Sequence, residues 1–146
     1  MIKINVIGRL PGGVTKTLAS RSVASAVLAA GVKEKAEINL IFVDQKKIRE
    51  LNRFWRKKDK ATDVLSFQEP KIPCPKDKVL LGEVFVSPAF IKETVKKEGG
   101  KFVEEVVRAI IHGVLHILGY NHSKTSERKL MFSIQESAFK MSLIKI

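Results

Sequence analysis

The sequence predicts an α+β fold, in which one mixed sheet of about four strands carries helices packed on it. Strand-like segments either alternate apolar and polar residues or form short apolar runs, and the helix-like segments show a helical apolar period. The two kinds of segment follow one another without the strict alternation that is typical of a parallel α/β protein. Because 146 residues is the usual size of one domain, we expect residues 1–146 to form a single domain.

The first half of the chain predicts two strands with a helix between them, followed by a basic helix. In residues 1–8 apolar side chains alternate with Lys3 and Asn5, which is the pattern of a half-buried strand. An Ala-rich helical segment follows and stops at Gly31. Asp44 is a typical N-cap residue and indicates where the basic helix begins. These elements, with the turn that follows the basic helix, are expected at residues 1–8, 15–30, 36–43 and 45–60.

The second half predicts two further strands and three helices. A proline-rich loop at 69–78 separates the two strands. Ser87 and Pro88 are typical of an N-cap and a first helical position, and Gly99-Gly100 closes the helix that they open. The next helix is too apolar for a surface helix, so we expect it at the centre of the fold. These elements are expected at residues 63–68, 79–86, 88–98, 101–118 and 125–142.

Positive charge is the strongest feature of the composition. The chain has 27 lysines and arginines against 15 acidic residues, a formal net charge of +12, which favours a polyanionic partner. Half of this excess lies in residues 45–60, where Phe54 and Trp55 interrupt the basic run. Aromatic rings among cations suit single-stranded nucleic acid. However, Trp55 is spaced from Ile48 and Leu51 like the apolar stripe of a helix, so we expect Trp55 in the core.

Composition also argues against several classes of protein. A hydrophobic share of 45% is too high for an intrinsically disordered chain. No apolar run approaches the ~18 residues of a transmembrane helix, and the N-terminus lacks the apolar centre of a secretory signal. A single cysteine, Cys74, excludes a disulfide within the chain. We therefore expect a cytoplasmic protein that does not associate with membranes.

All three histidines of the chain fall in one short motif, HGVLHILGYNH. His112 and His116 are four residues apart, so on a helix their side chains share one face and can bind one ion. Gly119 favours a turn that ends the helix and brings His122 back toward them. Three imidazole ligands with an open fourth position are typical of catalytic zinc. We predict a zinc site at these three histidines, which other divalent transition metals could also occupy.

The histidine spacing equals that of the metzincin proteases, H-E-x-x-H-x-x-G-x-x-H, except at one position. Gly113 stands where those enzymes have the glutamate that serves as general base, and glycine cannot accept a proton. Peptide hydrolysis by their mechanism is therefore disfavoured. A metal ion that activates water still suits phosphodiester cleavage, if nearby cations hold the substrate.

Two further motifs accompany the histidine motif: the segment LNRFWRKKDKATDVLSF from Leu51 to Phe67, and Leu81-Gly82-Glu83. Together the three motifs resemble the bacterial YbeY family of metal-dependent endoribonucleases. The similarity extends to Met131 and Glu136 and covers essentially the whole chain. It implies a single catalytic α+β domain that binds zinc through its three histidines and cleaves single-stranded RNA in the cytoplasm.

The resemblance also implies a cellular role and further site residues. The role is maturation of ribosomal RNA, notably at the 3′ end of the small-subunit RNA, and ribosome quality control, with the ribosome or a small-subunit ribosomal protein as partner. The essential arginine of the family falls at Arg56, so Arg56, His112, His116 and His122 are the predicted catalytic residues. The family usually has Tyr-Asp-His where this chain has Asn121 before His122. The cations predicted to bind RNA are Lys46, Lys47, Arg49, Arg53, Lys57 and Lys58.

Two other functions stay open. The same metal site could serve a protease or amide hydrolase, if Asp63 or Glu136 replaced the base that is missing at position 113. Alternatively, the protein could be a non-catalytic ribosome-assembly factor with a structural zinc, in which case a fourth protein ligand would complete the metal site.

Overall fold

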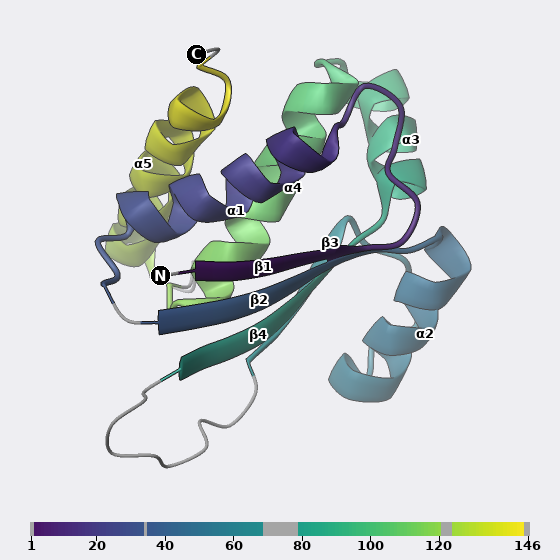
Figure 1. Cartoon of the computed structure of the whole chain (residues 1–146). Helices are drawn as coiled ribbons and strands as arrows, with labels where there is room; N and C mark the ends of the chain where they lie inside the picture. Colours follow the sequence, from purple (N-terminus) through teal and green to yellow (C-terminus); the bar gives the residue numbers. More distant parts are fainter. Residues whose placement is uncertain (1, 34, 69–78, 121–123, 145–146) are drawn as a thin grey trace.

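The computed structural model describes residues 2–33, 35–68, 79–120 and 124–144 (Figure 1). In these residues, four strands form one mixed sheet, and five helices pack on the sheet or on one another, which confirms the predicted α+β class. The elements are β1 Ile2–Ile7, α1 Lys16–Ala29, β2 Lys35–Phe42, α2 Gln45–Arg56, β3 Val64–Gln68, β4 Val79–Val86, α3 Pro88–Glu98, α4 Phe102–Ile117 and α5 Thr125–Ser142.

The sheet has the strand order β1-β2-β4-β3. Strands β1, β2 and β4 run parallel, whereas β3 lies at one edge and pairs with β4 in the antiparallel sense. Within this register Leu40 lies beside Val84, and Leu65 lies beside Phe85. Because consecutive side chains of a strand point to opposite faces, the buried Val84 and its neighbour Phe85 face different sides of the sheet.

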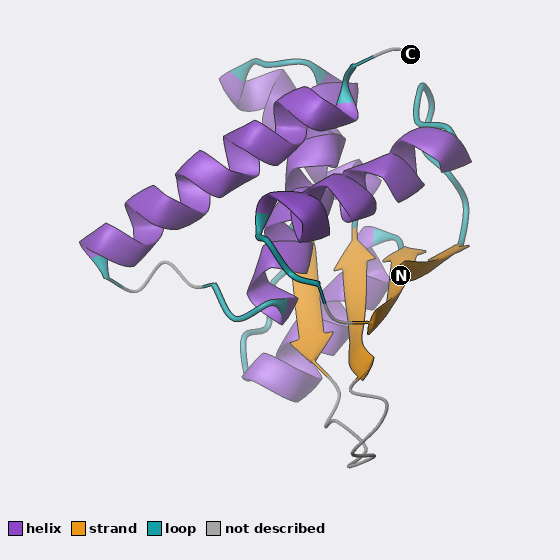
Figure 2. Cartoon of the chain, turned by 60° about the vertical axis from the view of Figure 1, so that its left-hand side comes forward, coloured by secondary structure: helices purple, strands orange, loops and turns teal. Residues whose placement is uncertain are grey.

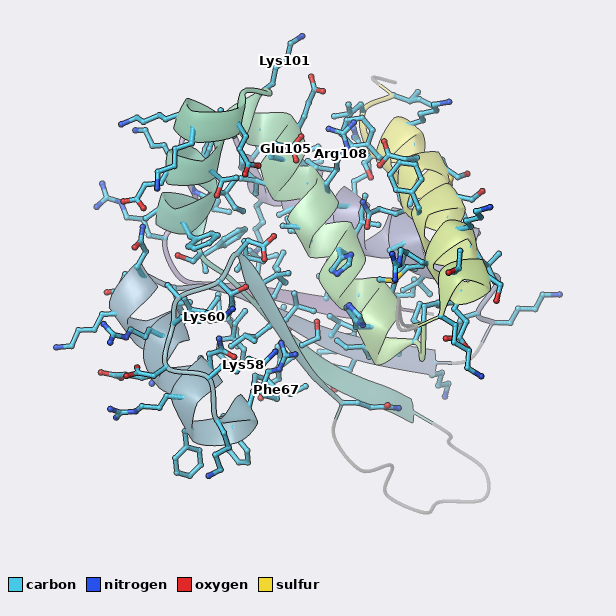
Figure 3. The ribbon with its side chains drawn as sticks, turned by 180° about the vertical axis from the view of Figure 1, so that it is seen from behind. Lys58, Lys60, Phe67, Lys101, Glu105 and Arg108 are labelled. Carbon is cyan, nitrogen blue, oxygen red and sulfur yellow. The ribbon has the colours of Figure 1, made fainter. Side chains whose placement is uncertain are left out.

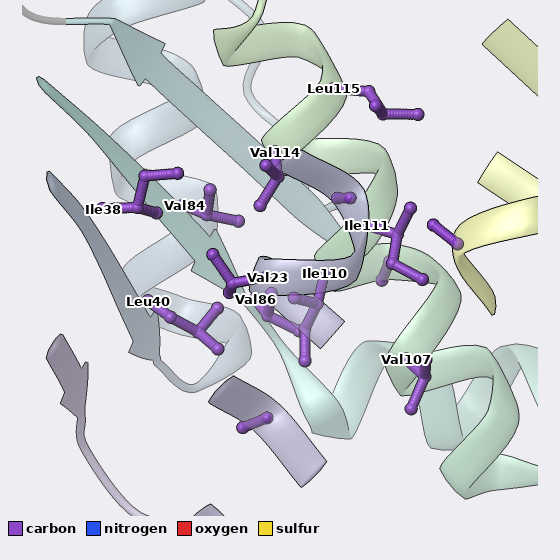
Figure 4. Packing of buried hydrophobic residues seen from close by; sticks show 14 of the residues in the cluster. Val23, Ile38, Leu40, Val84, Val86, Val107, Ile110, Ile111, Val114 and Leu115 are labelled. Carbon is purple, nitrogen blue, oxygen red and sulfur yellow. The ribbon is translucent and has the colours of Figure 1, made fainter. Parts of the chain in front are cut away.

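Most of the helical mass covers one face of the sheet. Helices α1 and α4 lie on this face with α5 against both, while α2 lies on the opposite side (Figure 1). Figure 2, turned by 60°, shows the same helical layer over the strands. Helix α4 is the predicted central helix: its Ile110 and Val114 are fully buried beside Val84 and Val86 of β4 (Figure 4). The hydrophobic core therefore lies between α4, α1 and the sheet.

Side chains at the ends of the helices explain why the predicted boundaries hold. The Asp44 carboxylate accepts a hydrogen bond from the Lys47 backbone N–H at 2.8 Å, as expected for the N-cap of α2. Thr15 caps α1 in the same way, accepting from the Leu18 N–H at 3.0 Å. Ser87 occupies the N-cap position of α3, but its side chain makes no capping hydrogen bond. The loop predicted at 69–78 lies outside the described residues.

The prediction for α2 is wrong at Trp55. Ile48 is fully buried as expected, but Trp55 is 62% exposed and Phe54 is 66% exposed. The inward position one turn after Ile48 belongs instead to Asn52, whose side-chain amide donates to the Lys60 carbonyl oxygen at 2.9 Å. A polar residue thus takes the buried position and anchors the following turn, and Trp55, in the last turn of the helix, is left on the surface.

No helix in the described part of the chain is both long enough and apolar enough to span a bilayer.

Candidate active site

Two of the predicted metal ligands converge at the C-terminal end of α4. The Nε2 atoms of His112 and His116 are 3.0 Å apart, and their ring planes are inclined at 80°. Two imidazole nitrogens bound to one tetrahedral zinc, each at ~2.0–2.1 Å from the ion, are separated by about 3.3 Å. The spacing of this pair therefore fits two ligands of a single ion. Gly119 ends the helix with a φ of 98°, as predicted, and His122 and Asn121 lie outside the described residues.

Gln135 of α5 orients the first histidine. Its side-chain oxygen lies 3.0 Å from Nδ1 of His112. Because an amide oxygen can only accept, Nδ1 carries the proton and Nε2 is left with a free electron pair, which is the form of histidine that binds a metal. The donor chemistry of the pair thus fits the predicted zinc. Among the described residues alone, no cluster of three histidine, cysteine or acidic side chains is close enough to hold an ion.

A hollow of about 420 Å³ opens beside His112. Helix α5 supplies its other walls, which are Gln135, the buried Met131, and the exposed Phe132 and Arg128. Met131, singled out by the family resemblance, therefore lies beside a predicted metal ligand. Position 131 gives one side of the hollow an apolar surface.

One helical turn before His112, an ion-pair cluster ties α4 to α5. The Arg108 guanidinium bonds Glu136 at 3.2 Å and Glu105 at 2.8 Å, and it lies 3.9 Å from the centre of the Phe139 ring (Figure 3 labels Glu105 and Arg108). Burial alone would lower the pKa of Arg108, but the two carboxylates outweigh it and raise that pKa above its usual value. Glu136 therefore serves as an ion-pair partner of Arg108.

Gly113, between the two histidines, faces the sheet. A Cβ atom at this position would lie 2.6 Å from Val84, 2.9 Å from Val64 and 3.0 Å from the Ser66 hydroxyl. The Ser66 hydroxyl itself donates to the Gly113 carbonyl oxygen at 2.7 Å. The structure therefore has no room for a glutamate at position 113, a steric requirement that sequence reasoning missed.

Asp63 has the structural role of a turn residue. Its carboxylate accepts hydrogen bonds from the Val64 N–H at 2.8 Å and from the Thr62 hydroxyl at 3.2 Å, at the start of β3. Asp63 lines a separate hollow of about 380 Å³ together with residues of α3, among them Phe90 and Thr94. Neither Asp63 nor Glu136 thus lines the hollow beside His112.

Arg56 is exposed at the last position of α2, and Lys57 after it adopts the left-handed conformation with a φ of 60°. Arg49 has a second role, because its guanidinium bonds Asp59 at 2.9 and 3.3 Å. This bond lowers the pKa of Asp59 and raises that of Arg49. The turn after α2, with Lys58 and Lys60, is labelled in Figure 3. All six cations predicted to bind RNA are exposed: Lys46, Lys47, Arg49, Arg53, Lys57 and Lys58.

The edge strand β3 separates the basic helix from the histidine helix. Ser66 bonds α4, whereas the next residue, Phe67, has its ring centre 6.0 Å from that of Trp55 in α2. Since neighbouring residues of a strand point to opposite faces, α2 and α4 lie on opposite faces of β3. The structure thus brings His112 and His116 together and places Arg56 across β3 from them, so the catalytic role of Arg56 stays a prediction.

These features define an α+β protein in which a candidate metal centre and a basic helix lie on either side of one edge strand. The family described as Endoribonuclease YbeY matches residues 13–142. The chain therefore belongs to the YbeY family, as its motifs predict.

Relatives and a solved structure agree with this assignment. The Endoribonuclease YbeY of Persephonella marina is 36% identical over 135 residues, which cover 86% of this chain and 88% of the relative. The Endoribonuclease YbeY of a Sulfurihydrogenibium species is 42% identical over 104 residues, covering 70% and 68% of the two chains. The solution structure of TM1509 from Thermotoga maritima matches with a TM-score of 0.64 and 26% identity, covering 95% of this chain and 88% of the other.

Proposed function

We propose that this protein is a zinc-dependent endoribonuclease that cleaves single-stranded RNA in the cytoplasm. The observation that carries the proposal is the convergence of the His112 and His116 Nε2 atoms, 3.0 Å apart, in a chain whose relatives are named endoribonucleases. The basic surface of α2 supports a polyanionic substrate.

His112 and His116, with His122 as the third ligand by sequence, would hold the ion. When bound, the ion would supply Lewis acidity and an activated water molecule. Gln135 keeps the proton of His112 on Nδ1 and so leaves Nε2 available. Arg56 would hold a phosphate oxygen of the substrate, because a guanidinium can bind phosphate through two hydrogen bonds. The other cations of α2 would attract the RNA strand toward the edge of the sheet.

Within this function, we propose ribosomal RNA as the substrate, notably at the 3′ end of the small-subunit RNA. A part in ribosome quality control and a small-subunit ribosomal protein as partner belong to the same proposal, which rests on family membership. Mapping of ribosomal RNA ends in cells that carry only the His116→Ala variant tests it. Extended 3′ ends support the proposal, and correctly trimmed ends contradict it.

The structure disfavours the protease alternative at each candidate base. Position 113 has no space for a carboxylate, Glu136 is paired with Arg108, and Asp63 is bonded in the turn before β3. For a non-catalytic protein with a structural zinc, X-ray absorption at the zinc edge would show four protein ligands. For the proposed enzyme, the spectrum should show three imidazoles and an oxygen ligand.

The decisive experiment compares the wild-type protein with His116→Ala on a single-stranded RNA, with metal content measured by mass spectrometry. We expect the variant to lose both the bound metal and the cleavage, while circular dichroism stays unchanged because His116 is only half-buried. Lys140→Ala, an exposed change on α5, is the control and should retain both properties. Equal cleavage by His116→Ala and wild type would contradict the proposal.

A further inference from the structure

Four aromatic rings form a row on the face of β3 opposite the histidines. Phe54 and Trp55 contact each other edge to face with ring centres 4.9 Å apart. Trp55 lies 6.0 Å from Phe67 of β3, which in turn lies 5.8 Å from Phe85 of β4. Phe67 and Phe85 are half-buried, whereas more than 60% of Phe54 and Trp55 is exposed. The row, Phe54–Trp55–Phe67–Phe85, thus begins on the surface and ends in the sheet.

Two adjacent exposed aromatic rings form an apolar patch, which is typical of a binding surface. A tryptophan and a phenylalanine side by side in water forgo the burial that usually stabilises such side chains. Packing of α2 does not explain them, because Ile48 is fully buried two turns earlier while both rings, in the last turn of the helix, stay largely exposed. Cation-rich sequence surrounds the two rings, with Arg53 before them and Arg56 directly after them.

The tip of α2 is also held in place before any partner binds. The Lys58 N–H donates to the Asn52 carbonyl oxygen at 3.3 Å, and the Asn52 side chain bonds the Lys60 carbonyl oxygen at 2.9 Å. Arg49 and Asp59 close the same turn with their paired hydrogen bonds. A surface that is already ordered loses little conformational entropy on binding.

We propose that Phe54 and Trp55 form a stacking platform for bases of the single-stranded RNA substrate, on the far side of β3 from the cleaved bond. This inference rests on the proposed function and adds a recognition element to it. Bases stack on exposed aromatic rings without regard to sequence, while the neighbouring cations pair with phosphates. The strand would pass over the edge of the sheet, from the platform, past Arg56, to the histidines.

The charge and shape of the platform favour RNA over other partners. A protein partner would cover Lys57 and Lys58 next to the rings, and lysine is depleted at the centres of protein interfaces. A membrane surface would need a broad apolar face, but the exposed apolar surface at this end of α2 is limited to two rings, since Ile48 is buried and Leu51 is half-buried. Single-stranded RNA can contact both parts of the surface, because its bases stack on the rings while its phosphates pair with the cations.

Trp55 is the only tryptophan of the chain, so the tryptophan fluorescence of the protein comes from this position alone. In the proposed complex, a stacked base quenches tryptophan fluorescence. The titration uses full-length protein treated with chelator, so that RNA is bound but not cut, and a fluorescein-labelled oligoadenylate of twelve nucleotides as probe. We expect quenching that follows the same binding curve as the anisotropy of the labelled RNA. Anisotropy that rises without any change in Trp55 fluorescence would overturn the proposal.

Substitutions separate stacking from charge and from folding. We expect Trp55→Ala to weaken binding of the probe by about tenfold, and Trp55→Phe to restore most of the loss. Leu28→Ala on α1 removes an equally exposed apolar side chain, 66% accessible, and should bind as the wild type does. Equal affinity of Trp55→Ala and wild type would contradict a platform.

An abasic oligonucleotide with the same phosphate backbone completes the test. The wild type should prefer the oligoadenylate over the abasic probe, and Trp55→Ala should lose this preference. If Trp55→Ala instead weakens both probes equally, Trp55 supports the basic surface and the platform is wrong. A shift of Trp55 emission with anionic phosphatidylglycerol vesicles but not with RNA would also overturn it. If the metal-loaded wild type does not cleave RNA although RNA still quenches Trp55 fluorescence, the proposed function is contradicted and the stacking platform is supported.

Discussion

The Ser66 hydroxyl donates a hydrogen bond of 2.7 Å to the Gly113 carbonyl oxygen, and so joins the edge strand β3 to the helix that carries both histidines. The bond falls between His112 and His116, at the point where α4 approaches the sheet so closely that only glycine fits. The position of the histidine pair relative to the sheet is therefore set by backbone contact at one residue.

Replacement of Gly113 by alanine should destabilise the protein by ~1–3 kcal/mol, because the new methyl group meets Val84, Val64 and Ser66 within 3.0 Å. Urea denaturation measures the free energy of unfolding. Gly12→Ala is the matched control, since a Cβ at Gly12 meets nothing within 4 Å. Equal stability of the two variants would mean that α4 shifts away from the sheet at no cost.

Replacement of Gln135 by leucine should lower zinc affinity by about 10- to 100-fold, because His112 loses the acceptor that fixes its Nδ1 proton. Competition with a chromogenic chelator measures this affinity directly. Ser133→Ala, an exposed change on the same helix, should leave it unchanged. Unaltered zinc affinity in Gln135→Leu would show that His112 needs no such partner.

Replacement of Arg108 by alanine should cost about 2 kcal/mol of stability, because two half-buried carboxylates lose their shared cation and Phe139 loses its contact. Thermal unfolding at neutral pH measures the effect. Lys101→Ala breaks an ion pair with Glu104 whose lysine side chain is 82% exposed, and should cost under about 0.5 kcal/mol. The prediction is wrong if the two variants unfold at the same temperature.

The Arg49–Asp59 bond should contribute a small, pH-dependent stabilisation. The hydrogen bond from Arg49 lowers the pKa of Asp59 in the folded state below its usual value of 3.8. Stabilisation is therefore present above about pH 4 and is lost as the pH falls through the lowered pKa. Asp59→Asn should be less stable than wild type at pH 7, and the difference should shrink toward pH 2. A difference that is independent of pH would contradict this prediction.

RNA affinity should fall steeply with salt concentration, because phosphates bound by cations release counterions. On a plot of the logarithm of affinity against that of salt, Lys57→Gln, which replaces a cation by a neutral side chain, should reduce the slope by about 0.7. Lys140→Gln, on the distant helix α5, removes the same charge and should leave the slope unchanged. A flat salt response of the wild type would mean that the basic surface does not contact RNA.

Local signals in the sequence predict most of the fold. The capping bond of Asp44 joins residues only three positions apart. The pairing of His112 with His116, four positions on, is fixed by helix geometry alone. Such contacts can be read from spacing because the chain between the partners is regular structure.

The features that sequence reasoning missed depend on contacts between distant segments. Gln135 meets His112 from another helix, and Ser66 meets Gly113 across 47 positions of the chain. Trp55 was misplaced for a related reason: the buried position before it belongs to Asn52, whose side chain bonds the Lys60 carbonyl oxygen after the helix has ended. The spacing of apolar residues gives no information about that hydrogen bond.

The close approach of α4 to the sheet has a consequence for the evolution of this scaffold. The histidine spacing is shared with proteases, and one substitution at position 113 would supply their glutamate. In this chain that step is costly, since the first carbon of any side chain at position 113 meets Val84, Val64 and Ser66 within 3.0 Å. A descendant with peptidase activity would have to recruit its proton acceptor from a different element or first move the whole helix.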